Sequence, residues 1–287
     1  DKDRTNFQKG YAYFSKKQNA KAKNYLEKVD LDGSYGNQAK YYLGYISYAN
    51  NDYQQANEYF ANVESVEKYQ ERMGYYKADM QFKSGNFDKA VEEGLAQMPK
   101  STEAEKSELS KIIGESYFNL KQYDKALPYL LAYEGKNGKL SNVDFYQLGY
   151  SYYQQKDYNK AVSEFSKIID GKDPFAQNAY DHLGESYLKL GQKTQALNAF
   201  KNASEMTFSP KIQEDAFANY AKLSYDIGNP YKSVPEVITD FLVKYPETPY
   251  KAELNDLLID SYISNKNYQA ALDVLESNRT PLNKAAY

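Results

Sequence analysis

Hydrophobic and polar positions recur along the chain at a nearly constant spacing. Aligned on one small residue, eight segments follow one another at intervals of 34, 34, 36, 35, 35, 37 and 38 residues. The aligned residues are Gly10, Gly44, Ala78, Gly114, Gly149, Gly184, Ala221 and Ile259. Twelve residues beyond them lie Ala22, Ala56, Ala90, Ala126, Ala161, Ala196, Ser233 and Ala271. This column of alanines predicts that the chain consists of eight copies of one structural unit.

Large side chains fill three further columns of the same segments. They stand three residues after the small position (Tyr13, Tyr117, Tyr152, Tyr187 and Tyr262), nine after it (Tyr53, Phe87, Tyr123, Tyr158 and Tyr268) and sixteen after it (Leu26, Phe60, Leu130, Phe165, Phe200 and Leu275). Turn-forming residues, such as 50–52 and 84–86, separate the small position from the alanine. Each segment is therefore predicted to be a helix, a tight turn and a second helix. We expect the small residues to face each other across this hairpin and the large ones to fill the seams between hairpins.

This combination of columns resembles the consensus of the tetratricopeptide repeat. The residues that carry the resemblance are Leu43, Gly44, Tyr53, Ala56 and Phe60 in the second segment, and Leu148, Gly149, Tyr152, Tyr158, Ala161 and Phe165 in the fifth. The resemblance implies an all-α, right-handed superhelical solenoid of about eight helix-turn-helix hairpins, whose first helices line a concave groove. The expected array spans residues 1–276, with units centred on residues 10, 44, 78, 114, 149, 184, 221 and 259. Residues 277–287 are expected to begin a further helix or a truncated next repeat.

Composition and charge exclude several classes of function. The net charge is −3, and only Arg4, Arg72 and Arg279 among the 36 basic residues are arginines, which argues against nucleic-acid binding. The chain has no cysteine and a single histidine, so we predict no disulfide, no metal site and no cofactor. That histidine, His182, is expected to be packed or hydrogen-bonded. No run of about 18 apolar residues occurs, so direct insertion into a membrane is not expected.

The acidic residues offer no catalytic arrangement. The pair Glu92 and Glu93 is expected on a polar helix face, where water solvates both carboxylates and a catalytic role is not expected. Residues 30–34 begin like a calcium-binding loop, but Tyr35 stands where such a loop turns on glycine, so a plain turn is expected there. The chain is therefore predicted not to be an enzyme.

One face of the first helices is unusually aromatic. Positions three before, one after and four after the small residue share a stripe, because they are spaced i, i+4, i+7, and the resemblance places this stripe in the concave groove. Thirteen of its 24 positions are aromatic, where the chain-wide 16% would give about four. They are Phe7, Tyr11, Phe14, Tyr41, Tyr45, Tyr48, Tyr75, Phe82, Phe118, Tyr146, Tyr150, Tyr153 and Tyr225. In the later units the stripe turns acidic, with Asp181, Glu185, Asp256 and Asp260.

These features favour a protein–protein interaction scaffold that binds a peptide or a partner protein through an aromatic groove. A glycan- or cell-wall-binding module is the alternative, since tyrosine rings stack on sugars as readily as on side chains. A third function, that of an enzyme, would need a domain outside this sequence. The structural interpretation of the same rings is that they only pack against neighbouring hairpins. Self-association remains open, and the carboxylate clamp of chaperone-binding relatives is not expected, because aromatic residues such as Phe7 and Tyr45 occupy its positions.

The expected location is the periplasm or envelope of a bacterium, with the cytoplasm as the alternative. The basis is that residues 241–246 and 248–250 resemble tetratricopeptide proteins of the bacterial envelope. The start on Asp1 and the end on Tyr287 suggest a piece of a longer protein. The identity of the partner and the oligomeric state do not follow from the sequence.

Overall fold

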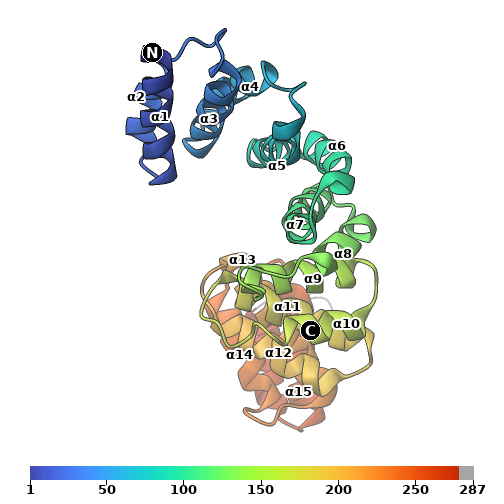
Figure 1. The fold of residues 1–287 in the computed structure, drawn as a ribbon. Helices are drawn as coiled ribbons and strands as arrows, with labels where there is room; N and C mark the ends of the chain where they lie inside the picture. Colours follow the sequence, from blue (N-terminus) through green and yellow to red (C-terminus); the bar gives the residue numbers. More distant parts are fainter. Residues whose placement is uncertain (278–287) are drawn as a thin grey trace. The chain divides into compact units, whose positions relative to one another are not determined.

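A computed structural model of the chain describes residues 1–277 and shows an all-α fold (Figure 1). The helices are α1 (Lys2–Ser15), α2 (Asn19–Leu26), α3 (Gly36–Ala49), α4 (Tyr53–Ala61), α5 (Glu67–Lys83), α6 (Phe87–Gln97), η1 (Met98–Lys100), α7 (Glu103–Asn119), α8 (Tyr123–Ala132), α9 (Asn142–Gln154), α10 (Tyr158–Phe165), α11 (Pro174–Lys189), α12 (Lys193–Glu205), α13 (Pro210–Ile227), α14 (Val234–Lys244), α15 (Lys251–Ser264) and α16 (Tyr268–Ser277). The sixteen α-helices form the eight hairpins that the columns predict. The further helix expected over residues 277–287 falls almost entirely outside the described residues.

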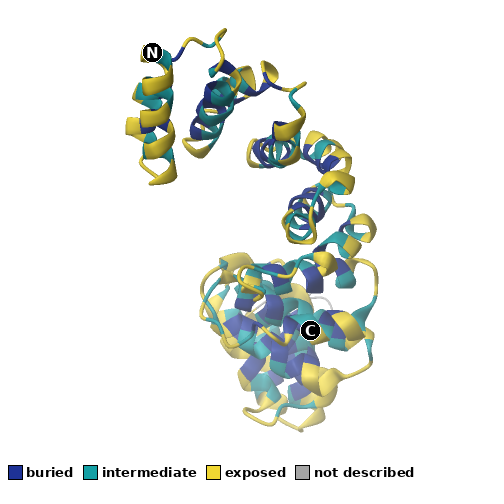
Figure 2. Cartoon of the chain, viewed as in Figure 1, coloured by how far each residue is buried: buried dark blue, intermediate teal, exposed yellow. Residues whose placement is uncertain are grey.

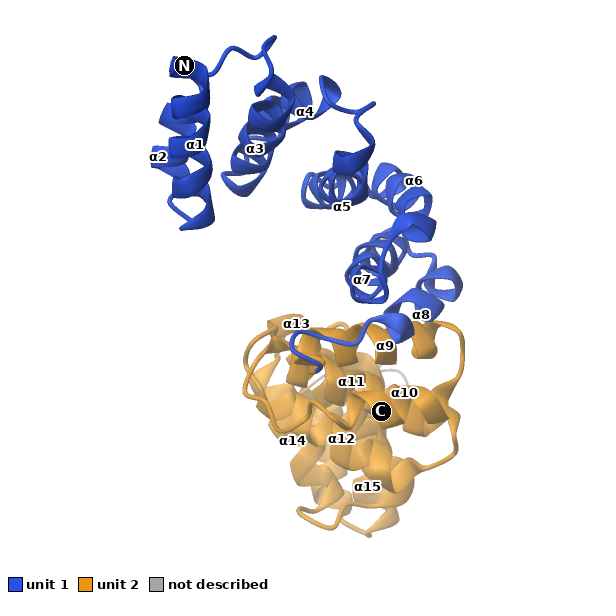
Figure 3. Cartoon of the chain, viewed as in Figure 1, with its two compact units in different colours: residues 1–138 blue, residues 139–287 orange. Residues whose placement is uncertain are grey.

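The chain divides into two compact units, Asp1–Gly138 and Lys139–Tyr287 (Figure 3). The first unit contains α1 to α8 and the second α9 to α16. Within each unit the second helix of a hairpin contacts the first helix of the next, as α6 contacts α7 and α12 contacts α13. First helices also contact one another, as α5 and α7 do in the first unit and α11 and α13 in the second. Each unit is therefore a stack of hairpins.

Buried residues, dark blue in Figure 2, occur along the helices of both units. The alanine column belongs to them: six of its alanines are 0% exposed and Ala271 is 3% exposed, and a side chain this small allows close packing of helices. Ser233, the exception, is exposed and caps α14, its hydroxyl accepting a hydrogen bond from the N–H of Glu236. The seventh hairpin is also the one with a long turn of six residues, 228–233, where the other seven have three.

The small position and the large position sixteen residues later pack against each other inside one hairpin. A Cβ atom built on Gly44 or Gly184 would lie 2.6 Å from the ring of Phe60 or Phe200. The expectation that the small residues face each other, and that this large column fills only the seams, was therefore wrong. The third hairpin differs, because both of its positions are small, Ala78 and Gly94. There a Cβ atom built on Gly94 would lie 2.7 Å from the side chain of Ile113 on α7, so the next hairpin fills the space.

Every turn between paired helices has a left-handed residue seven positions after the small residue. These residues are Lys17, Asn51, Gly85, Lys121, Lys156, Gly191, Gly228 and Lys266, with φ between 59° and 85°. The next residue donates its N–H to the carbonyl five residues earlier in seven of the turns, as Asp157 does to Tyr152 at 2.9 Å. Four of the eight are lysines, although a left-handed conformation costs a residue with a Cβ roughly 1–2 kcal/mol.

Replacing Lys156 with glycine is expected to raise the free energy of unfolding by about 1 kcal/mol, because glycine relieves this conformational cost. Lys156 is exposed, with φ of 62°, so no packing is lost. Lys156→Ala is the matched control and should give no gain, since alanine keeps the Cβ. Urea denaturation followed by circular dichroism measures both, and an equal gain in the two variants would assign the effect to the lost charge.

Candidate partner-binding surface

The predicted aromatic stripe lies on the first helices, as expected, and none of its members is fully buried. Tyr11 and Tyr225 are 47% and 39% exposed, and the other eleven aromatic residues are partly exposed. All lie on first helices: α1, α3, α5 and α7 in the first unit, and α9 and α13 in the second. The stripe is thus neither core nor free surface, so each ring combines packing with an accessible edge.

In the first unit the stripe forms a continuous series of ring contacts across three hairpins. Phe14 contacts Tyr45 with ring centroids 5.5 Å apart, and Tyr45 contacts Tyr76 at 5.3 Å. Tyr41 stacks on Tyr69 at 4.4 Å and an interplanar angle of 14°. Tyr69 and Tyr76 were not predicted as part of the surface, because they lie outside the three positions chosen for the stripe. They fix the rings of the stripe from the neighbouring helix.

A carboxylate ends this series of rings. The Tyr48 hydroxyl donates a hydrogen bond to Asp79, which is 7% exposed. Burial, followed by the bond to Asp79, raises the pKa of Tyr48 well above its usual value, so the hydroxyl stays a donor. Lys83 lies 3.0 Å from Asp79 and its Nζ is 5.5 Å from the centre of the Tyr48 ring. The lysine therefore compensates the buried charge.

Two pockets open along this surface in the first unit. One, of about 430 Å³, is lined by Phe7, Tyr11, Gln38, Tyr41, Tyr42, Lys68 and Tyr69. The other, of about 470 Å³, has the side chains of Tyr75 and Phe82 beside charged residues that include Lys83, Glu108 and Lys111. Both pockets combine aromatic side chains with at least one charged residue, a combination that also occurs in protein–protein interfaces.

The second unit carries the same framework around His182. Its imidazole lies 5.1 Å from the ring of Tyr153, 5.2 Å from Tyr150 and 6.2 Å from Tyr146, and it stacks on Phe165 at 5.6 Å. His182 is therefore packed among aromatic rings, one of the two expected environments. The Tyr153 hydroxyl donates a hydrogen bond to Glu185, as Tyr48 does to Asp79 in the first unit.

The two frameworks correspond residue by residue. Tyr41, Tyr45, Tyr48, Tyr53, Phe60, Tyr69, Tyr76, Asp79 and Lys83 match Tyr146, Tyr150, Tyr153, Tyr158, Phe165, Phe175, His182, Glu185 and Lys189. Matched residues are 105 positions apart in the sequence for the first five pairs (146 − 41) and 106 positions apart for the last four (182 − 76). Each ring contact of the first set recurs in the second, as Tyr48 with Tyr53 recurs as Tyr153 with Tyr158. Each unit thus presents one copy of the same surface.

The acidic positions predicted in the later hairpins are not all brought together. Asp181 and Glu185 are neighbours on α11, whereas Asp256 and Asp260 lie exposed on α15. Burial, with Glu185 as the next cause, raises the pKa of Asp181 to about 7. Burial acts to raise the pKa of Glu185 too, but His182 and the Tyr153 hydroxyl stabilise its charge, and the net shift is downward.

An exposed apolar row runs beside these acids and was missed by the sequence interpretation. Leu188, Tyr225 and Ile263 occupy the position four after the small residue in the last three hairpins and are 38%, 39% and 46% exposed. Only Tyr225 belongs to the predicted aromatic stripe, because leucine and isoleucine are not aromatic. The periodic position itself would have found the two aliphatic ones.

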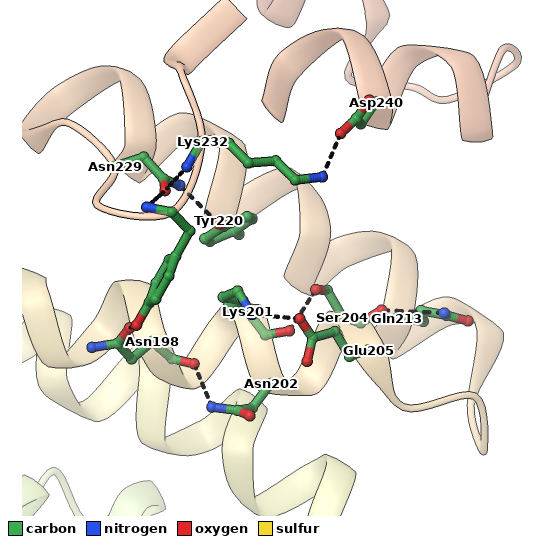
Figure 4. A network of polar contacts seen from close by, with 11 residues as sticks. Asn198, Lys201, Asn202, Ser204, Glu205, Gln213, Tyr220, Asn229, Lys232 and Asp240 are labelled. Atoms are coloured by element: carbon green, nitrogen blue, oxygen red, sulfur yellow. Dashed lines mark hydrogen bonds and ion pairs between the residues drawn. The ribbon is translucent and has the colours of Figure 1, made fainter. Parts of the chain in front are cut away.

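A pocket of the second unit lies away from the stripe, between α12, α13 and α14 (Figure 4). It measures about 590 Å³ and was not predicted from the sequence. Two of its three lysines are paired with acids, Lys201 with Glu205 at 2.6 Å and Lys232 with Asp240 at 3.0 Å. The polar groups that Figure 4 shows converging here therefore hold the six-residue turn against α12 and α14.

Comparisons with known proteins agree with the geometry. Two family descriptions named tetratricopeptide repeat match the chain, one at residues 3–30 and 177–209 and the other at residues 145–170. No curated protein matches the sequence. No helix in the described part of the chain combines the length and apolar character needed to cross a membrane.

Solved structures with the same fold share little sequence with the chain. The C-terminal part of a TPR repeat-containing protein from Cytophaga hutchinsonii is 16% identical, with a TM-score of 0.53, covering 93% of this chain and 99% of that one. YrrB, described as a TPR protein with an unusual peptide-binding site, is 15% identical, with a TM-score of 0.51. The match covers 64% of this chain and 92% of that one. The apo form of RapI is 12% identical, with a TM-score of 0.50, and the match covers 96% of this chain and 87% of that one.

Proposed function

Because the chain belongs to the tetratricopeptide-repeat family, we propose that it is a non-enzymatic scaffold whose aromatic surfaces bind a partner polypeptide. Proteins of this fold are generally interaction modules, and YrrB, a structural neighbour, is described as having a peptide-binding site. The observation that carries the proposal is the duplicated framework of partly exposed rings, each copy ending in a tyrosine-bound carboxylate.

The rings suit a polypeptide because their faces are largely occupied. Tyr41 stacks on Tyr69, and Tyr146 stacks on Tyr150, so one face of each of these rings is occupied by another ring. The edges of such rings contact side chains and backbone at low entropic cost, since the rings are already held in place. Stacking on a sugar needs an open ring face, which makes the glycan alternative the less supported one.

The charge differs between the two surfaces, and this suggests an orientation for the ligand. Asp79 is neutralised by Lys83 in the first unit, whereas Asp181 and Glu185 face the rings of the second. We therefore expect an apolar or aromatic segment of the partner on the first unit and a basic segment on the second. An envelope location in a bacterium belongs to the same proposal and is supported by the resemblance of residues 241–250 alone.

Selection of peptides from a random display library on the immobilised chain tests the proposal. The exposed Tyr11 and the partly exposed Tyr150 are expected to contribute, so Tyr11→Ala with Tyr150→Ala should weaken selected peptides about tenfold or more, measured by calorimetry. The matched control is Tyr13→Ala with Tyr152→Ala, which removes tyrosines two positions along the same two helices. Affinity should then change less than about twofold.

Two outcomes would overturn the proposal. Equal losses in both double variants would show that the effect is on stability. Absence of selected peptides, together with retention of the chain on polysaccharide matrices, would favour the glycan-binding alternative.

A further inference from the structure

Three side chains with metal-binding atoms converge on one side of α11. Asp181, His182 and Glu185 each offer one ligand atom, and these atoms all lie within 4.8 Å of one another. His182 Nδ1 is 3.8 Å from Glu185 Oε2. This distance exceeds a hydrogen bond, and it is close to the separation of about 3.3 Å expected between two ligands of a zinc ion bound at roughly 2.0–2.1 Å.

One ring nitrogen of His182, Nδ1, is in a position to bind a cation. This atom is buried and makes no hydrogen bond within the described residues. A neutral imidazole has one nitrogen that acts only as an acceptor, and leaving it unpaired in the interior is unfavourable. Four rings hold the imidazole plane, among them Tyr153 and Phe165, so it cannot turn toward water without breaking these contacts. A bound cation would satisfy Nδ1 where it stands.

Glu185 is also fixed in place. The Tyr153 hydroxyl donates a hydrogen bond to it from the neighbouring hairpin. Hydrogen bonds of this kind orient metal ligands and improve affinity. His182 and Glu185 are three residues apart and therefore share a helix face, while Asp181 reaches the same point from the adjacent position.

The equivalent place in the first unit lacks these ligands. Tyr75, Tyr76 and Asp79 occupy the corresponding positions, and Lys83 lies 3.0 Å from Asp79. In the second unit, no ion pair joins Glu185 to the corresponding Lys189 among the described residues. The same aromatic framework thus surrounds a lysine-compensated carboxylate in one copy and an imidazole with two carboxylates in the other.

We propose that Asp181, His182 and Glu185 bind a divalent transition-metal ion of the Zn²⁺ type at the surface of the second unit. One imidazole nitrogen and two carboxylate oxygens suit Zn²⁺, Co²⁺ or Ni²⁺, with a further position left for water or for a partner's side chain. This site goes beyond the proposed binding of a polypeptide and does not depend on it. It departs from the expectation of no metal site, which rested on counting histidines.

The single histidine of the chain allows a direct test. Zn²⁺ is added to the full chain, prepared without a histidine tag and labelled at histidine, and the imidazole resonances are followed by NMR. The expected result is one saturable shift of the His182 signals at a stoichiometry of one ion per chain. Zinc binding that leaves these signals unmoved, or no binding at all, overturns the proposal.

Conservative variants test the carboxylates. Asp181→Asn and Glu185→Gln should each weaken Zn²⁺ binding about tenfold or more, as measured by calorimetry. The control is Asp256→Asn with Asp260→Asn, an acid pair at the matching positions of the last hairpin that has no histidine, and it should change the affinity less than about twofold. Circular dichroism checks that each variant is folded. Unchanged binding in both carboxylate variants, or an equal loss in the control, overturns the three-ligand site.

Discussion

Replacing Phe200 with alanine is expected to lower the free energy of unfolding of the second unit by about 3–5 kcal/mol. The ring is 0% exposed and belongs to a cluster of buried residues contributed by α12, α13, α14 and α15. Its removal leaves a cavity against Gly184, and helix packing on both sides prevents the backbone from closing it. Urea denaturation monitored by circular dichroism measures the loss.

Gly184, which faces the ring of Phe200, allows a second test, because the effect of its replacement on stability should change direction when the ring is absent. Gly184→Ala alone should destabilise the chain by about 1–3 kcal/mol, because the new Cβ would overlap the ring of Phe200. In the Phe200→Ala background the same change should stabilise it by about 1 kcal/mol, since the overlap is gone and alanine is the better helix former. If Gly184→Ala has the same sign in both backgrounds, the two columns do not share a volume.

Replacing Gln177 with methionine is expected to cost about 3 kcal/mol or more. This side chain is 0% exposed and holds the connection between α12 and α13. Its Nε2 donates to the carbonyl oxygens of Ala203, Met206 and Ser209 at 3.2, 2.7 and 3.3 Å, and its Oε1 accepts from the N–H of Ser209 at 2.7 Å. Methionine fills a similar volume but leaves these buried backbone groups without a partner.

A second glutamine, on α13, also bonds to the end of α12 and serves as the control. Gln213 donates one hydrogen bond, to the carbonyl of Ser204 at 3.1 Å, and is partly exposed. Gln213→Met should therefore cost no more than about 1 kcal/mol. Hydrogen exchange at the Ser209 N–H gives a local readout, and it should accelerate only when Gln177 is changed. Similar losses of stability in both variants would contradict the role given to Gln177.

The sequence predicted the fold because every hairpin repeats the same sizes at the same positions. It did not predict which columns touch, since a column shows that Gly44 is small and Phe60 large but not that they meet. The left-handed column was also missed at Lys17 and Lys121, because lysine is not a turn-forming residue and tertiary packing imposes the conformation.

The candidate site was predictable in position but not in detail. Helical spacing alone placed Tyr45, Tyr48 and Tyr150 on one face of the first helices. The contacts with Tyr76 and His182 join neighbouring hairpins and depend on how these helices pack, which no single-helix periodicity reveals. The acceptors of the tyrosine hydroxyl groups, Asp79 and Glu185, were hidden for the same reason, 31 and 32 residues away along the chain.

The correspondence between the two aromatic surfaces extends to the first and fourth hairpins, where the contact of Tyr13 with Tyr25 recurs as Tyr117 with Tyr129. The offset there is 104 residues (117 − 13), so three successive hairpins recur as a block. A relative lengthened by one whole block would gain a third complete aromatic surface. Insertion of a single hairpin after α4 would instead separate Tyr48 from Asp79 and leave its hydroxyl without that acceptor. Duplication of the whole block of three hairpins therefore adds a surface and keeps the existing ones.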